Sequence, residues 1–212
     1  MFRDLIAFAK NSLKKTKINK SDIKKYNDKY LEMHYNIITQ NGISGRIIIK
    51  EGKKMPNIIL TRIDNRLVHG QVATQWCGSI GANLILVAND EVSTNTLRQG
   101  LMDMAAPSYA AMRYWSIEKT ISTIHKASDK QLIFIVCENP QDVLRLVEGG
   151  VPIKKVNIGN MHMAEGKRQV AGSVAVDDAD VAAFAKLRDL GVELEIRRVP
   201  SEATESIEKL FK

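Results

Sequence analysis

Residues 57–71, NIILTRIDNRLVHGQ, join a short apolar run to a polar turn that contains two arginines, an aspartate and a histidine. Residues 57–61 are too few and too rich in isoleucine and leucine for a helix, and they suit a buried strand of a parallel sheet. His69 and Gly70 then lie where the carboxyl end of the strand leads into a helix. Ligands bind at such a place in an open α/β sheet, because the first amide N–H groups of the helix lack partners and attract anions.

The polar turn has the residue types of a phosphate site. Arg62 and Arg66 supply charged, forked donors that suit phosphate, and Gly70 would let a phosphate approach the backbone. A neutral imidazole is a good nucleophile toward phosphorus, so His69 can act as a phosphoryl relay. Asp64 could hydrogen-bond the imidazole and fix which nitrogen is free. The alternative, in which His69 caps a turn and the arginines are solvated surface, stays open at this point.

Beyond the turn, residues 55–212 alternate short apolar runs with longer segments of helical period, and glycine often stands before the next apolar run. This alternation predicts an open, mostly parallel, doubly wound α/β sheet with helices on both faces. Ser116, Asn139 and Asp177 stand where helix N-caps are expected. The expected strands are 57–61, 84–88, 112–115, 132–137, 155–158, 172–176 and 193–199, and the expected helices are 71–79, 94–105, 117–127, 140–148, 178–190 and 202–211.

The positive charge of the chain belongs to its first quarter. The chain has 212 residues and a net charge of +7, but residues 1–54 carry +8 and residues 55–212 carry −1. A membrane-surface helix, a nucleic-acid arm and a leader without function would each explain such an extension. We favour the leader, because the codons for KEGKK before Met55 are rich in purines and resemble a bacterial ribosome-binding sequence. Met55 would then be the true start.

Candidates for metal, nucleotide and redox sites are weak. No two histidines have the spacing of metal ligands, and no strand is followed by GxGxxG, so no metal, nucleotide or other cofactor is expected. His162 follows a predicted strand and is a candidate for lining the pocket. Cys77 and Cys137 fall in apolar runs and read as reduced, buried thiols of a cytosolic protein. The remaining large apolar side chains in periodic segments read as core: Trp76, Trp115, Met102 and Met104.

No apolar stretch approaches the length of a membrane span, which needs about 18 residues, and the first residues lack the pattern of a secretory signal. The chain is therefore expected in the cytoplasm.

The motif RIDNRLVHGQV resembles the IIB component of the mannose, fructose and sorbose family of the bacterial phosphoenolpyruvate-dependent sugar phosphotransferase system (PTS). The resemblance covers residues 55–212 and is most similar to the N-acetylgalactosamine and galactosamine branch. Residues 1–54 match nothing in the family pattern. The segments that carry the resemblance beyond the motif are ANLILVANDEV, LRQGLMDMA, GGVPIKKVNIGNMH and LGVELEIRRVP.

The resemblance implies a phosphohistidine–sugar phosphotransferase. His69 would take a phosphoryl group from a IIA phosphohistidine and pass it to a sugar, an amino sugar such as N-acetylgalactosamine or otherwise mannose, fructose or sorbose. Arg66 matches the family arginine beside the histidine, Asp64 the acidic residue of the same turn, and Arg98 a second basic position. Arg62 and Gly70 also fall within the motif.

The resemblance also implies partners. The membrane components IIC and IID would translocate the sugar and hold this cytoplasmic chain at the membrane periphery, with no nucleic acid involved and a homodimer left open. The rival interpretation is a non-catalytic regulatory or nucleic-acid-binding protein that uses the basic extension. The near-neutral charge of residues 55–212 gives that rival no support.

Overall fold

The computed structural model describes residues 34–38, 44–48, 55–70 and 72–211, and the chain divides into two compact units, Met1–Lys53 and Lys54–Lys212. In the first unit, β1 (His34–Ile38) and β2 (Ser44–Ile48) form an antiparallel pair. Most of the basic extension lies outside the described residues. The expectation that it is a leader without function stays a prediction.

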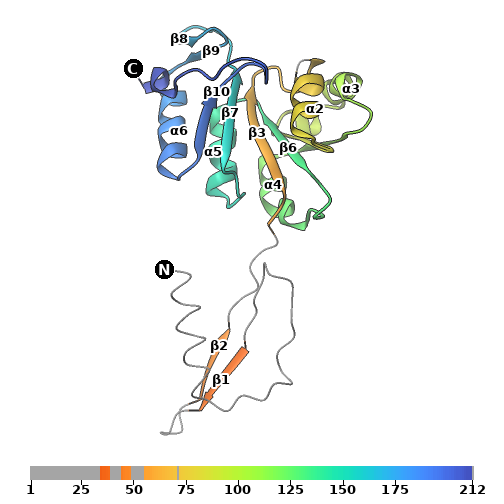
Figure 1. Ribbon diagram of the computed structural model, residues 1–212, viewed down its shortest axis with the longest axis vertical. Coiled ribbons are helices and arrows are strands. Elements are labelled where there is room, and N and C mark those ends of the chain that lie inside the picture. The colour runs from red at the N-terminus through yellow and green to blue at the C-terminus, as the bar shows by residue number, and fades with distance from the viewer. Residues whose placement is uncertain (1–33, 39–43, 49–54, 71, 212) are drawn as a thin grey trace. The chain divides into compact units, whose positions relative to one another are not determined.

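The second unit is built on a six-stranded sheet in which every pair of neighbouring strands is parallel (Figure 1). The strand order is β10-β7-β3-β6-β4-β5. Central strands β4 and β6 read LILVA and IFIVC and are buried at every position, as expected for strands covered on both faces. The strands are β3 (Ile58–Asp64), β4 (Leu84–Ala88), β5 (Ala111–Trp115), β6 (Ile133–Cys137), β7 (Lys155–Asn160) and β10 (Glu193–Ile196).

Helices cover both faces of this sheet, as the sequence predicts. One core cluster joins the sheet to α4 (Ile117–Thr123), α5 (Pro140–Glu148) and α6 (Asp178–Asp189). The other cluster packs the opposite face under the chain that follows β3 and under α3 (Thr96–Ala105). The chain after β3 continues as a π-helical turn, Val72–Trp76, and α2, Cys77–Ile80.

The topology places a crevice at the end of β3. The chain leaves β3 for β4 on one side, returns to β6 beside β3, and then crosses to β7 on the other side. Connections that lead to opposite halves of a parallel sheet leave a crevice at the carboxyl ends of the strands, where ligands bind. The turn that contains His69 follows β3 directly at this edge.

The predicted N-caps are confirmed. The side chains of Ser116 and Asn139 accept the backbone N–H groups of Lys119 and Asp142, at the starts of α4 and α5. Asp177 forms a reciprocal capping box with Asp180 at the start of α6.

Several predicted elements differ from those observed. Of the run 172–176, only β9 (Val174–Val176) is a strand, and it forms a separate antiparallel pair with β8 (Arg168–Ala171). The backbone of this run also bonds to Met161, one residue beyond the end of β7. Of the predicted helix 202–211, only Ile207–Phe211 is helical, as a 3-10 turn. The N–H group of Glu205 instead donates to the carbonyl of Ile196 and ties this segment to β10.

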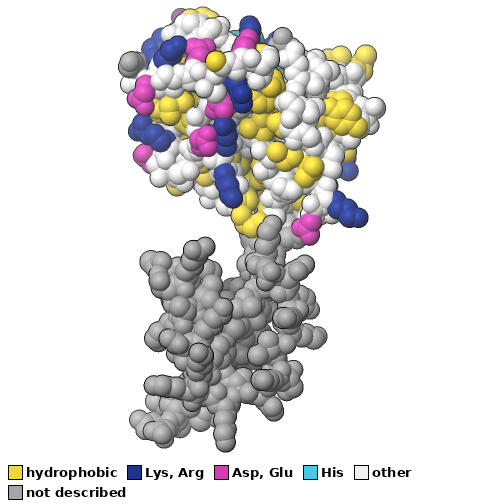
Figure 2. All heavy atoms as spheres, viewed as in Figure 1, with side chains coloured by type: hydrophobic (Ala, Val, Ile, Leu, Met, Phe, Trp, Pro, Cys, Tyr) yellow, Lys and Arg dark blue, Asp and Glu magenta, His cyan; other side chains and the backbone are white. Residues whose placement is uncertain are grey.

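The remaining predictions concern buried groups and the surface. Cys77 and Cys137 are free and fully buried, as expected. Met102 lies in the core, but Met104 is 85% exposed, so its assignment to the core is wrong. Lys, Arg, Asp and Glu side chains are interspersed on the face of the second unit seen in Figure 2, in keeping with its near-zero net charge. Among the helices of the described segments, none has the length and apolar character needed to cross a bilayer.

Candidate active site at the carboxyl end of β3

The turn after β3 holds a leucine in an unusual backbone conformation. The N–H group of Leu67 donates to the carbonyl of Asp64 at 2.8 Å, and Leu67 has a φ of 56°. A left-handed conformation costs a non-glycine residue about 1–2 kcal/mol. The Leu67 side chain is fully buried in the core cluster beneath α3, and this burial holds the strained turn in place.

His69 lies two residues beyond Leu67 and is half-buried. Its Nδ1 lies 3.1 Å from the carbonyl oxygen of Leu67, which can only accept, so Nδ1 carries a hydrogen in this conformation. Its Nε2 is covered and has no partner among the described residues.

Burial lowers the pKa of His69. The Leu67 carbonyl and the charge of Asp64 oppose this shift, while Arg66 and Arg62 add to it. A lowered pKa favours the neutral imidazole, the form that acts as a nucleophile.

Asp64 organises the turn from inside. It is fully buried, and its Oδ2 accepts from Arg62 Nη2 at 2.9 Å. Its Oδ1 accepts the backbone N–H of Arg66 at 3.1 Å and lies 3.5 Å from Arg66 Nε. The expected hydrogen bond from Asp64 to the imidazole is not formed, because the Leu67 carbonyl takes that place at Nδ1. Asp64 acts on His69 through charge and through the shape of the turn.

Arg66 and Gly70 face the open side of the turn. The Arg66 side chain is 43% exposed, which leaves its guanidinium accessible to an anion. A Cβ added at Gly70 would meet nothing within 4 Å. A phosphate beside His69 would therefore meet free space at Gly70 and a cation at Arg66.

Arg62 lies inside the protein, in contrast to Arg66. It is 1% exposed, and its guanidinium donates to Asn157 Oδ1, to the carbonyl of Arg197 and to Asp64. Asn157 is likewise buried, on the neighbouring strand β7. The hydrogen-bond partners of Arg62 thus lie inside the protein, and they disfavour a direct contact between Arg62 and phosphate. That contact stays a prediction.

Asn65 is a site residue that the sequence reasoning missed, although it stands in the motif. Its N–H donates to the carbonyl of Asn160 at 3.0 Å, and its Oδ1 accepts the backbone N–H of His162. Its Nδ2 donates to the carbonyl of Glu138 at 3.2 Å. One asparagine thus ties the histidine turn to the ends of β7 and β6. His162 is exposed beside the turn, with its Nε2 3.3 Å from Asn160 Nδ2.

Arg98 lies on α3 and is already paired. Its Nη1 donates to Glu91 at 2.9 Å, and its Nη2 lies 3.5 Å from Glu138. Glu138 follows β6 and also receives the Asn65 amide on its carbonyl. Arg98 therefore borders the edge of the sheet that carries the histidine turn, but its guanidinium is shared between two carboxylates.

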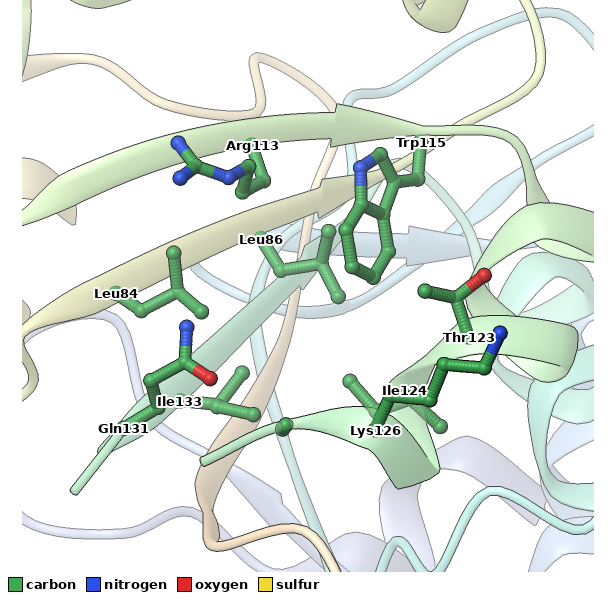
Figure 3. Close-up of a pocket in the computed structure, with 10 residues that line it drawn as sticks. Leu84, Leu86, Arg113, Trp115, Thr123, Ile124, Lys126, Gln131 and Ile133 are labelled. Atoms are coloured by element: carbon green, nitrogen blue, oxygen red, sulfur yellow. The ribbon is translucent and has the colours of Figure 1, made fainter. Parts of the chain in front are cut away.

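A cavity of about 120 Å³ lies away from the histidine turn. Figure 3 shows the side chains that line it. It opens between strands β4, β5 and β6 and the chain after α4, and its lining includes Leu86, Trp115 and Ile124 with Arg113 and Lys126. No residue of the histidine turn lines it. Among the described residues, no group of three or more His, Cys, Asp or Glu side chains could hold a metal ion.

Comparisons with known proteins agree on one family. Residues 58–212 match the family described as the PTS system sorbose subfamily IIB component. The chain is similar to the N-acetylgalactosamine-specific phosphotransferase enzyme IIB component 2 of Escherichia coli K12, with 51% identity over 157 residues, 74% of this chain and 100% of that protein. It is also 41% identical over 144 residues to the mannose-specific EIIAB component of the same strain, covering 68% of this chain and 45% of that protein.

A solved structure shows the same fold. The crystal structure of the N-acetylgalactosamine-specific IIB component 1 from Escherichia coli matches with a TM-score of 0.69 and 48% identity, covering 71% of this chain and 99% of that chain. The shared fold and the matching family together define the class, that of phosphotransfer proteins. This chain belongs to the sorbose subfamily of PTS IIB components, which are phosphotransferases, and the resemblance seen in the motif is confirmed.

Proposed function

We propose that His69 accepts a phosphoryl group from a phosphohistidine of a IIA component and passes it to a sugar. The observation that carries this proposal is the half-buried imidazole of His69 in the turn after the central strand, which also contains Arg66 and Asp64. Burial lowers the pKa of His69, which favours the nucleophilic form of the ring. The names of the most similar relatives favour N-acetylgalactosamine or another amino sugar over mannose, fructose or sorbose.

Both transfers are in-line displacements at phosphorus. In the first, the lone pair of His69 attacks, the bond from phosphorus to the donor imidazole breaks, and that imidazole keeps the electron pair. In the second, a sugar hydroxyl attacks the phosphorus, the bond from phosphorus to His69 breaks, and the freed nitrogen keeps the electron pair, with which it takes up the hydroxyl proton. Catalysis of such a step is mainly positioning and stabilisation of the charge on the phosphoryl oxygens. Arg66 supplies an accessible guanidinium, and Gly70 leaves the space that the phosphoryl group would fill. Arg98 would add a second cation if phosphate drew it from Glu91 and Glu138.

The imidazole of His69 must reorient for transfer to occur. Nδ1 is engaged by the carbonyl of Leu67 and Nε2 is covered, so neither nitrogen faces a donor in this conformation.

The partners follow from the same proposal. A IIA component would bring the phosphoryl group, and IIC and IID components would present the sugar from the membrane to this cytoplasmic chain. The E. coli relative named EIIAB supports the IIA partner, because its name joins both components in one protein. In this proposal residues 55–212 are the phosphotransfer domain and residues 1–54 take no part.

The test is phosphorylation in a defined system. Purified protein is incubated with phosphoenolpyruvate, the general phosphotransferase proteins and a IIA component of the N-acetylgalactosamine type, and the phosphate is mapped under alkaline conditions that preserve phosphohistidine. We expect one acid-labile phosphate on His69, dependent on IIA. His69→Ala should take none, while His162→Ala, which removes an exposed imidazole beside the same turn, should still be phosphorylated. Phosphate on the His69→Ala protein, or none on wild type with an active IIA, would overturn the proposal.

A further inference from the structure

A row of polar residues crosses the sheet beneath the histidine turn. In the strand register Arg62 of β3 pairs with Asn157 of β7, and Asn157 pairs with Glu195 of β10. Residues paired in this way point to the same face of a sheet. Their exposed fractions are 1%, 0% and 7%. Burying charged and amide groups is unfavourable unless each finds a hydrogen-bond partner, so the donors and acceptors of these three side chains must complement one another.

Asn157 is the centre of this row. Its Oδ1 accepts from Arg62 Nη1, while its Nδ2 donates to Glu195 Oε1 at 3.3 Å and to the carbonyl of Arg197 at 3.0 Å. A guanidinium can only donate and a carbonyl can only accept, so these neighbours fix which way the amide points. Asparagine can both accept from Arg62 and donate to the acceptors on the other side. Leucine can do neither, and ionised aspartate can only accept.

The amide of Asn157 fixes the plane of the Arg62 guanidinium. Nη1 is bound to Asn157 and Nη2 to Asp64, and the planar fork makes the two bonds interdependent. The Trp76 ring lies 5.3 Å from Arg62 Cζ. A Cβ at Gly159 would lie 1.8–2.1 Å from the guanidinium atoms, so glycine is required there.

The contacts continue from Arg62 to the site. Arg62 holds Oδ2 of Asp64, and Oδ1 of Asp64 accepts the backbone N–H of Arg66 in the histidine turn. We propose that Asn157 is a positioning residue for phosphoryl transfer, which acts on the turn through Arg62 and Asp64 without touching His69. This inference rests on the proposed function, because it assigns Asn157 a role in the transfer that His69 would perform.

The first test is the rate of phosphoryl transfer in Asn157→Leu, which has a similar shape but no amide. At saturating phosphorylated IIA, we expect the single-turnover rate of His69 phosphorylation to fall about tenfold to a hundredfold, as misplaced catalytic groups do. The IIA concentration for half-maximal rate should stay within about twofold of the wild-type value, because the surface that meets IIA is unchanged.

Two variants keep this test specific. Asn83→Leu is the control, because it removes an asparagine amide that bonds the backbone on both sides but lies exposed before β4, away from Arg62. The Asn83 side chain donates to the carbonyl of Lys130 at 2.9 Å and accepts from Leu132 N at 2.8 Å. We expect Asn83→Leu to keep the wild-type rate. Asn157→Asp retains the acceptor for Arg62, so it should transfer at least about fivefold faster than Asn157→Leu. If Asn157→Leu does not fold, Asn157→Ser replaces it, because its hydroxyl is too short to reach Arg62, and the same loss is expected.

The second test is hydrogen exchange and needs no phosphoryl donor. The Arg66 amide proton bonds to Asp64, so its hydrogen exchange in the free protein reports on the end of the contact chain. Relative to core amides of β6, exchange at Arg66 should accelerate about tenfold in Asn157→Leu and not in Asn83→Leu. If wild type takes no phosphate on His69, the proposed function fails while this exchange still tests the chain of contacts.

A folded Asn157→Leu protein with wild-type transfer would overturn the positioning role. A slower transfer with unchanged exchange at Arg66 would overturn the route through Arg62 and Asp64.

Discussion

The two motif arginines, Arg62 and Arg66, differ in what their surroundings allow. Arg66 is 43% exposed with a single carboxylate partner among the described residues, whereas Arg62 is enclosed and bonded on both terminal nitrogens. Sequence patterns identify both as charged residues near a histidine. Only the fold shows that the Arg62 side chain is buried, because its hydrogen-bond partner Asn157 lies 95 residues away in the chain.

Replacing Arg66 by lysine should slow transfer. Arg66→Lys keeps the charge but loses the planar fork that matches phosphate. We expect the rate to fall about tenfold to a hundredfold, equivalent to a loss of about 1.4–2.8 kcal/mol of transition-state stabilisation. The measurement is the single-turnover rate of His69 phosphorylation by phosphorylated IIA. Wild-type rates in Arg66→Lys would mean that this guanidinium does not contact the phosphoryl group.

The pH dependence of His69 should show its lowered pKa. Free imidazole titrates near pH 6.5, so the midpoint for loss of phosphate acceptance on acidification should lie below about pH 6.5. The unfolded chain then binds the proton more readily than the folded protein. The contribution of His69 to stability is therefore present above about pH 6.5 and is lost as pH falls toward the folded pKa.

The measurement is an NMR titration of the His69 ring in the unphosphorylated protein. Arg66→Gln should raise this pKa, because it removes a cation that lowers it. A wild-type midpoint at or above 6.5 would contradict the prediction.

At the scale of elements, strands and helices could be predicted wherever an apolar run or a helical period was long enough. Runs such as IFIVC became strands, and caps such as Asp177 began helices where expected. The run at 172–176 was assigned to the main sheet because a short strand does not encode its partner. Met104 was assigned to the core because α3 has apolar residues on two faces, and its outer face carries Leu97, Leu101 and Met104.

The approach of β7 to β3 can be tested with two glycines. Gly159→Ala should displace the Arg62 guanidinium and destabilise the fold by about 2–4 kcal/mol, through overpacking and broken hydrogen bonds. Gly100→Ala is the control, because a Cβ on α3 would meet nothing within 4 Å there. It should stabilise the protein by about 0.5–1 kcal/mol through helix propensity. Urea unfolding measures both, and equal midpoints in the two variants would refute the close packing at Gly159.

At the scale of the molecule, the fold class followed from the alternation of strand and helix patterns. The site was predictable only in part, because the motif names the turn but not the residues beneath it. Asn157, Glu195 and Trp76 come from β7, β10 and the π-helical turn, and only folding brings them under Arg62. The sequence carries one sign of this arrangement, because an asparagine within a buried strand, such as Asn157, needs a hydrogen-bond partner.

The division of the chain into two compact units predicts that the second unit is self-sufficient. In urea unfolding, a protein of residues 55–212 should have the same free energy of unfolding as the second unit of the full chain, within about 0.5 kcal/mol, and it should accept phosphate at the same rate. Mass spectrometry of the native protein would show directly whether it begins at Met55. A lower free energy of unfolding or a slower rate in the shortened protein would assign residues 1–54 a role.

Leu67 has to satisfy two requirements that usually exclude each other. Its backbone takes a conformation that suits glycine, while its side chain fills a place in the core. Glycine would relieve the backbone but leave a hole, and valine or isoleucine would fit the left-handed region poorly because they branch at Cβ. The position two residues before the histidine therefore accepts a very small set of amino acids. A large aliphatic residue that is not branched at Cβ, two residues before the histidine, would therefore indicate from sequence alone that such a turn is intact.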